Sequence, residues 1–284
     1  MSFKFAFLDS GTGGIPYMQY LKQKCPDSYC LYLADTLNFP YGTKTPQQII
    51  ENACSCISLI VQKWNPDAIV IACNTISVTA LDVIRRRFSQ VHIVGTVPAV
   101  KLAATVSKNH TIGLLATEGT VHHPYITDLK EKFASDCNLL LRGDSNLVSF
   151  VENRFFKSSL QECLDAVEPA CNFFLSHGCD AIILGCTHFV HLRNIFQQAV
   201  NGKAVIVDSR DGVVRQSLKV VGEKNQSPDC PHDDSGIFSL LADFLSEKPL
   251  DQSLFVTGFS GQDLSAKYQD LCRSLQIPWG GILR

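Results

Sequence analysis

The sequence predicts an α/β protein whose parallel sheets carry helices on both faces. Short apolar runs alternate with longer segments of helical spacing, and this alternation restarts near residue 111. In addition, the segments DAIVIACNT and DAIILGCTH resemble each other and begin at residues 67 and 180, an offset of 113. Because ligands of parallel sheets bind at the carboxyl ends of the strands, we expect a functional site there.

The first part of the chain contains four strand-like runs. Residues 3–8 (FKFAFL) are apolar, and the following DSGTGG predicts a turn. Thr45 and Pro46 are typical of a helix N-cap and a first helical position. The run AIVIA is apolar throughout, as expected of a strand buried on both faces. The expected strands are 3–8, 29–33, 68–72 and 92–95, and the expected helices are 15–24, 45–64 and 78–88.

The second part repeats this pattern. The expected strands are 111–116, 139–141, 181–184 and 204–207, and the expected helices are 124–135, 160–177 and 191–200. No run after residue 207 is able to make a sheet of its own. The segment from Gly222 to Ser235 is polar and contains two prolines, so we expect an exposed loop.

Composition restricts the class of protein. The length of 284 residues predicts one large domain or two modest ones, and 45% hydrophobic with 18% charged residues excludes a disordered chain. A net charge of −2 gives no electrostatic reason to expect nucleic acid or a membrane as partner. The apolar runs are far shorter than the roughly 20 residues that span a bilayer. The N-terminal run stops at Asp9, too early for a signal peptide. We therefore expect a cytoplasmic protein.

Twelve cysteines are present, without a C-x-x-C pair. None of their spacings matches a zinc-site template, so no structural metal is expected. Two of them end the similar segments, because Cys73 and Cys186 each follow a strand-like run. If the two copies belong to lobes that face each other, two thiols approach one cleft from opposite sides. The alternative interpretation is a chance similarity between two common strand patterns.

Two such thiols suit the inversion of a carbon centre. One sulfur removes a proton from one face while the other returns a proton to the opposite face, at about 3–3.5 Å from the carbon. An unperturbed cysteine is already a few per cent thiolate at neutral pH. Asp9, His188 and Glu152 are candidates to hold or take up these protons. Their ordinary alternatives are a helix N-cap, a hydrogen-bonded histidine and a solvated surface residue, respectively.

Polar loops follow several of the expected strands. Ser10 with Gly11, Gly13 and Gly14 leaves backbone N–H groups at a helix start, which is a natural anion cradle. Phosphate fits poorly, because neither G-x-G-x-x-G nor G-K-[ST] is present. Hydroxyl, amide and backbone groups that suit carboxylates and an ammonium are offered by Tyr41, Gly42, Asn74, Thr75, Thr117, Thr120 and Thr187. The alternative interpretation is ordinary turn residues.

These motifs resemble the cofactor-independent aspartate/glutamate racemase family over nearly the whole chain. DSG-x-GG and PYG are the more specific of them and favour the members that act on glutamate. The segments that carry the resemblance are DSGTGG (9–14), NFPYGTKT (38–45), ACNT (72–75), GTVPA (95–99), ATEGTV (116–121), GCTH (185–188), VDS (207–209) and FVTGFS (255–260).

The resemblance implies two similar lobes, each a mainly parallel sheet flanked by helices, with the active site in the cleft between them. Residues 1–96 and 208–284 would form the first lobe, and 97–207 the second. It also implies interconversion of L- and D-glutamate for bacterial peptidoglycan, in a cytoplasmic homodimer that needs no pyridoxal phosphate, metal or nucleotide.

The resemblance assigns roles residue by residue. Cys73 and Cys186 fall on the paired acid/base positions, and Asp9, Glu152 and His188 fall on assisting positions. The implied substrate-binding positions are Ser10, Tyr41, Gly42, Asn74, Thr75, Thr117, Thr120 and Thr187. Two other functions remain open: an aspartate racemase or maleate-type isomerase on the same scaffold, and a non-catalytic module that binds a small dicarboxylate.

Overall fold

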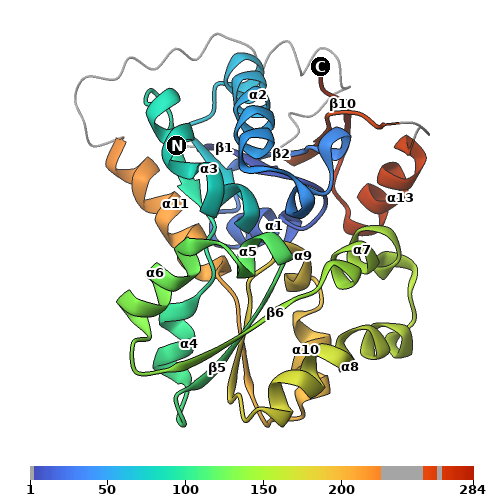
Figure 1. Cartoon of the computed structure of the whole chain (residues 1–284). Coiled ribbons are helices and arrows are strands. Elements are labelled where there is room, and N and C mark those ends of the chain that lie inside the picture. The colour runs from blue at the N-terminus through green and yellow to red at the C-terminus, as the bar shows by residue number, and fades with distance from the viewer. Residues whose placement is uncertain (1–2, 225–251, 261–263) are drawn as a thin grey trace.

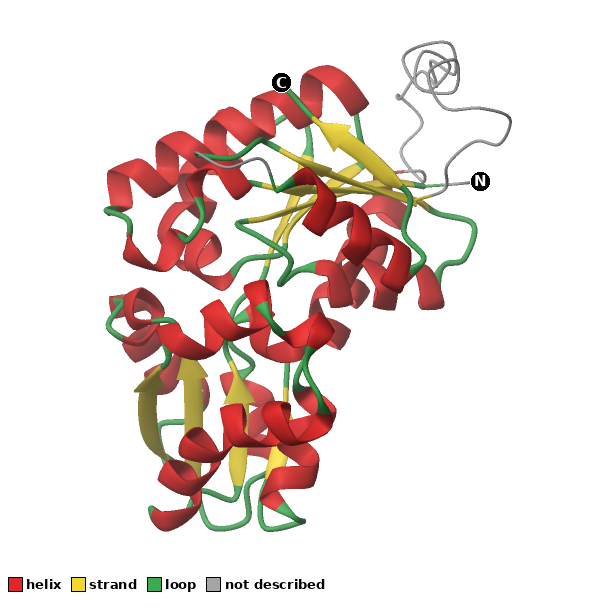
Figure 2. Cartoon of the chain, turned by 90° about the vertical axis from the view of Figure 1, so that its right-hand side faces the viewer, coloured by secondary structure: helices red, strands yellow, loops and turns green. Residues whose placement is uncertain are grey.

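The computed structural model describes residues 3–224, 252–260 and 264–284. It contains two parallel sheets that form two lobes, one above the other in Figure 1, and Figure 2 shows helices on both faces of each sheet. The strand order is β10-β9-β2-β1-β3-β4 in the first lobe and β6-β5-β7-β8 in the second. The predicted fold class is therefore confirmed.

The first lobe is built from both ends of the described chain. Its strands are β1 (Lys4–Asp9), β2 (Tyr29–Ala34), β3 (Ala68–Ile71), β4 (His92–Gly95), β9 (Gln252–Val256) and β10 (Trp279–Ile282). Its helices are α1 (Ile15–Lys24), η1 (Thr36–Asn38), η2 (Tyr41–Thr43), α2 (Pro46–Trp64), α3 (Asn74–Arg87), α11 (Arg210–Lys224) and α13 (Ser265–Leu275).

The second lobe uses the intervening part of the chain. Its strands are β5 (Thr111–Ala116), β6 (Asn138–Gly143), β7 (Ala181–Leu184) and β8 (Val205–Val207). Its helices are α4 (Val100–Val106), α5 (Glu118–Val121), α6 (Pro124–Phe133), α7 (Ser145–Asn153), η3 (Phe155–Lys157), α8 (Leu160–Ser176), α9 (Thr187–Val190) and α10 (Arg193–Val200).

The two lobes repeat one arrangement of strands. The order β2-β1-β3-β4 recurs as β6-β5-β7-β8, and β3 and β7, which carry the similar sequences, take the same place in each sheet. Ala68 lies opposite Phe5 on β1, as Ala181 lies opposite Ile112 on β5. The sequence similarity is therefore a structural repeat, and the interpretation as chance is wrong.

The structure corrects several expected boundaries. Helix α3 begins at Asn74, four residues before the expected start, because its first turn is buried beyond the carboxyl end of β3, although its Asn and Thr residues are weak helix formers. The expected loop from Gly222 begins too early, since α11 continues to Lys224, and residues 225–235 lie outside the described residues. Strands β9 and β10 were not expected. They extend the first sheet rather than form another.

The start of α2 shows how local sequence sets an element. Thr45 accepts a hydrogen bond from the backbone N–H of Gln48, and the Gln48 side chain accepts one from the backbone N–H of Thr45, which forms a capping box. Pro46 occupies the first helical position, where its missing N–H costs nothing. The buried residues Ile49, Ala53, Ile57, Ile60 and Trp64 recur at helical spacing and pack on the first sheet.

We expect Thr45→Ala to lower the free energy of unfolding by about 1 kcal/mol, because it removes one partner of the capping box. Chemical denaturation measures this loss. Thr105→Ala is the matched control, since the Thr105 hydroxyl bonds only the Lys101 carbonyl within an exposed helical turn. Equal losses in the two variants would contradict the role of the cap.

Candidate active site

A cavity of about 230 Å³ lies between the two lobes, where the carboxyl ends of their strands face each other. Both lobes contribute to its wall, and both Cys73 and Cys186 line it. The lining residues are Ser10, Phe39, Pro40, Tyr41, Gly42, Thr43, Cys73, Asn74, Thr75, Thr117, Ser145, Val148, Ser149, Cys186, Thr187 and His188. The site thus forms at the edge of the sheets where a parallel fold exposes its ligands.

Equivalent backbone positions hold the two thiols. Cys73 follows β3 and immediately precedes α3, while Cys186 follows Gly185 after β7 and immediately precedes α9. Both have extended backbone conformations, and both side chains are buried. The strand-to-helix turn in each lobe therefore aims one sulfur into the shared cavity.

Asp9 lies on the Cys73 side of the site. It is fully buried at the end of β1 and accepts hydrogen bonds from the backbone N–H groups of Ser10 (2.7 Å) and Gly14 (2.6 Å). Asp9 is not the N-cap of α1, because that position belongs to Gly14. Burial raises the pKa of Asp9. Burial and the nearby Asp9 charge also raise the pKa of Cys73, so this thiol retains its proton.

A different pair lies on the Cys186 side. His188 Nδ1 is 3.9 Å from Cys186 Sγ, and His188 Nε2 is 3.0 Å from Glu152 Oε2. Burial raises the pKa of Glu152, but hydrogen bonds and the His188 charge outweigh it and lower the pKa to about 2. Burial opposes protonation of His188, but its contacts with Cys186 and Glu152 raise its pKa well above the usual range. Both directions favour an imidazolium paired with a carboxylate.

Glu152 is buried, with 3% of its side chain exposed, so it is not a solvated surface residue. It lies on α7 of the second lobe, yet three of its donors belong to the first lobe. The Thr12 backbone N–H and hydroxyl donate to Oε2 at 2.9 and 2.7 Å, and the Tyr268 hydroxyl donates to Oε1 at 2.5 Å. The carboxylate thus joins the two lobes behind the cavity.

The glycine-rich loop after β1 acts differently from the expected cradle. Its N–H groups at Ser10, Thr12 and Gly14 bind the protein's own carboxylates, Asp9 and Glu152, rather than standing free for a ligand. The glycines instead allow other side chains to lie close to the loop backbone. A Cβ atom on Gly13 would lie 2.4 Å from His188 Nδ1, which no real structure tolerates without displacement.

Most of the predicted substrate-binding residues line the cavity, and Thr120 does not. It lies behind the wall, where its hydroxyl contacts those of Thr75 (3.3 Å) and Thr117 (2.9 Å). The amide oxygen and nitrogen of Asn74 are both buried, without a hydrogen-bond partner among the described residues. Since buried polar atoms are normally paired, these atoms point to a polar ligand.

Further residues that support the site were not predicted. Buried Asp35 accepts hydrogen bonds from Tyr41 (2.6 Å) and Thr257 (2.7 Å), which fixes the wall segment around Tyr41. His191 Nε2 donates to the Thr12 carbonyl at 2.9 Å. Tyr268 comes from a segment more than a hundred residues away from Glu152. No local pattern marks these residues, because each is defined by a partner from another part of the chain.

One group of metal-ligating residue types gathers among the described residues. It consists of His110, Asp136 and Cys137. These residues precede β5 and β6, at the opposite end of the second sheet from Cys186, so they do not belong to the cavity.

Two equivalent α/β lobes that present one thiol each to a shared cavity have an arrangement suited to an enzyme of acid/base chemistry on a small molecule. The chain belongs to the Asp/Glu/hydantoin racemase family, whose model matches residues 17–216. It is therefore an isomerase of the racemase type. None of the helices in the described part of the chain is long and apolar enough to cross a membrane.

The similarity to known proteins covers most or nearly all of this chain. A glutamate racemase of Treponema pallidum is 34% identical over 281 residues, which cover 99% of this chain and 97% of the relative. One of Actinobacillus pleuropneumoniae is 36% identical over 216 residues, covering 76% and 80%. The solved structure of Escherichia coli glutamate racemase, in complex with L-glutamate and the activator UDP-MurNAc-ala, has a TM-score of 0.81 at 26% identity and covers 100% of this chain and 98% of that one.

His191 generates a prediction about pH and stability. Burial lowers its pKa from 6.5 to about 4, so the folded protein holds it neutral. A depressed histidine pKa stabilises the fold above pH 6.5, and this stabilisation is lost as the pH falls towards 4. Between pH 7 and 4.5 we expect wild type to lose on the order of 2 kcal/mol more than His191→Gln, which keeps a donor for Thr12. Denaturation at each pH measures this, and parallel curves would contradict it.

Proposed function

We propose that this protein interconverts L- and D-glutamate by moving protons between the substrate Cα and two thiols. The observation that carries the proposal is that Cys73 and Cys186, from equivalent positions in the two lobes, line one buried cavity. The full-length relative from Treponema pallidum supports glutamate as substrate. So does the structural likeness to an enzyme solved with L-glutamate.

The electrostatic difference between the two sides supports different starting roles for the two thiols. Cys186 lies 3.9 Å from His188 Nδ1, whose raised pKa favours the charged ring, and we take this sulfur as the base of the first half-reaction. Cys73 keeps its proton beside Asp9 and is the acid. Cys186 removes the Cα proton to leave a planar carbanion, and Cys73 protonates the opposite face. The sulfurs have then exchanged roles, and the reverse reaction restores them.

The polar wall would hold the substrate while this happens. Asn74 offers the unpaired amide, and the hydroxyls of Ser10, Thr75, Thr117 and Thr187 supply further donors and acceptors for two carboxylates and an ammonium. Tyr41 and Gly42 close one side. Burial from water strengthens each of these interactions as negative charge develops at Cα.

The wider assignments complete the proposal. D-glutamate from this reaction would supply bacterial peptidoglycan, and thus cell-wall synthesis and cell shape, in the cytoplasm, with the enzyme acting as a homodimer. The chain would divide into a first domain of residues 1–96 and 208–284 and a second of 97–207. The partition of strands between the two sheets supports this division.

Racemisation in D2O tests the two-thiol mechanism. We expect product glutamate to carry solvent deuterium at Cα, and Cys73→Ala and Cys186→Ala each to reduce turnover by at least about 1,000-fold, because each removes an acid/base group. Cys25→Ala, at the end of α1, is the matched control and should retain wild-type turnover. Full retention of the α-proton, or normal turnover in either site variant, would refute the mechanism.

Substrate choice is tested separately, with glutamate and aspartate assayed side by side. We expect kcat/KM to favour glutamate by about 100-fold or more, because a substrate one methylene shorter leaves polar groups of the wall unpaired. Preference for aspartate would instead indicate an aspartate racemase on this scaffold. Binding of either without Cα exchange would indicate the non-catalytic module.

A further inference from the structure

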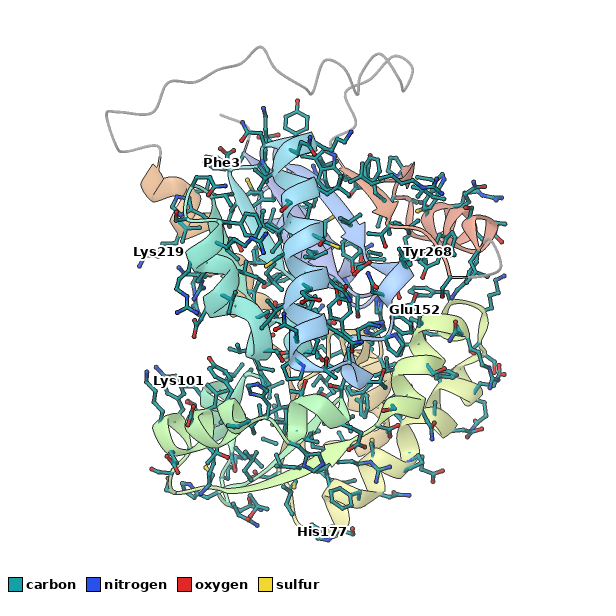
Figure 3. The ribbon with its side chains drawn as sticks, turned by 45° about the horizontal axis from the view of Figure 1, so that its top comes forward. Phe3, Lys101, Glu152, His177, Lys219 and Tyr268 are labelled. Atoms are coloured by element: carbon teal, nitrogen blue, oxygen red, sulfur yellow. The ribbon has the colours of Figure 1, made fainter. Side chains whose placement is uncertain are left out.

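Helix α13 of the first lobe contacts Glu152, behind the thiol of Cys186. Figure 3 shows the labelled Tyr268 on this helix beside Glu152 on α7. Two neighbouring contacts dock the same helix: Lys267 Nζ donates to Asn153 Oδ1 at 2.9 Å, and Lys157 Nζ lies 3.9 Å from Asp270 Oδ2. The contact of Tyr268 with Glu152 is therefore held from both sides.

The two oxygens of Glu152 are held unequally. Oε2 accepts hydrogen bonds from Thr12 and His188. The Tyr268 hydroxyl is the one donor to Oε1 among the described residues. Tyr268 is 3% exposed, so its hydroxyl contacts Oε1 in a buried environment. A buried carboxylate oxygen without a donor strongly favours protonation of the group.

Building on the proposed function, we propose that Tyr268 is a positioning residue that keeps Glu152 ionised and thereby keeps His188 charged behind Cys186. The chain of contacts runs from the Tyr268 hydroxyl through the carboxylate and the imidazole to the Cys186 sulfur. Cys73 has a separate chain of contacts, from the Tyr32 hydroxyl through the Asp9 carboxylate, and no hydrogen bond of Tyr268 leads into it among the described residues. Tyr268 thus acts on one of the two thiols.

The sign of the effect follows from the charges. Without the hydroxyl, the pKa of Glu152 rises and the carboxylate holds the His188 proton less firmly, so the pKa of His188 falls. The charged and titratable groups that face Glu152 are Asp9, Tyr32, His188, His191 and Lys267, besides Tyr268. The proposed role of His188 requires its charge. When Tyr268 is changed, the loss of activity on the alkaline side of the pH profile should therefore begin at a lower pH.

The first test needs no substrate. In Tyr268→Phe we expect the pKa of His188, followed by NMR in the ligand-free protein, to fall by about one unit or more, as for loss of a hydrogen bond to a charged group. The phenyl ring keeps its packing against Phe259, at a centroid distance of 5.7 Å. Tyr268→Met replaces the phenol with a flexible apolar side chain and should also lower the pKa of His188. An unchanged His188 titration in a folded variant overturns the proposal.

The second test uses turnover of glutamate. In Tyr268→Phe we expect kcat to fall on the order of tenfold with little change in KM, and the alkaline limb of the pH profile to move to lower pH. Tyr20→Phe, which removes an exposed hydroxyl bonded to Asp211, and Asp270→Asn, which weakens the docking of α13 without touching Glu152, should leave the limb in place. A uniform loss at all pH values would indicate a merely structural role and overturn the proposal.

The two tests separate two failures. If wild type does not racemise glutamate, the proposed function fails, while the NMR titration still decides whether Tyr268 controls His188. If wild type racemises glutamate and Tyr268→Phe matches it in both titration and pH profile, only the role of Tyr268 fails.

Discussion

The ionised Glu152 carboxylate is the constraint on which the arrangement of the site depends. An unpaired charge in the protein interior costs several kcal/mol, so it persists only when nearly every lone pair has a partner. Thr12 and Tyr268 provide donors from one lobe and His188 from the other. The hydrogen bonds of this one buried carboxylate therefore require a defined position of one lobe relative to the other. The same position brings two thiols to one cavity.

The two halves of the cavity are alike in backbone and unlike in charge. The strand order and the turn after each central strand repeat, so the sulfurs approach from related positions. A buried carboxylate accompanies Cys73, and an imidazolium accompanies Cys186. The two sulfurs thus lie in a symmetrical frame with unequal neighbours, and the different starting roles proposed for them rest on this inequality.

Local sequence predicted what depends on local physics. Apolar runs located β3 and β7, and the matching DAI segments showed that Cys73 and Cys186 end equivalent strands. Contacts between distant segments could not be predicted from local sequence. Glu152 was a candidate for an assisting role, with a solvated surface residue as the alternative, and no local pattern indicated its contact with Tyr268 from the returning chain. The glycine loop suggested a free anion cradle, but the N–H groups of Ser10 and Gly14 bond Asp9 of the same turn, and that of Thr12 bonds Glu152, which only the folded chain brings there.

Within the described residues the chain passes between the lobes after β4 and again after β8, and residues 97–99 and 208–209 together line a second cavity, separate from the one that holds the two thiols. Two adjacent covalent crossings would let one lobe turn about the line that joins them, while they resist sliding of one lobe past the other. Such a rotation would change the separation of the two sulfurs without deforming either sheet.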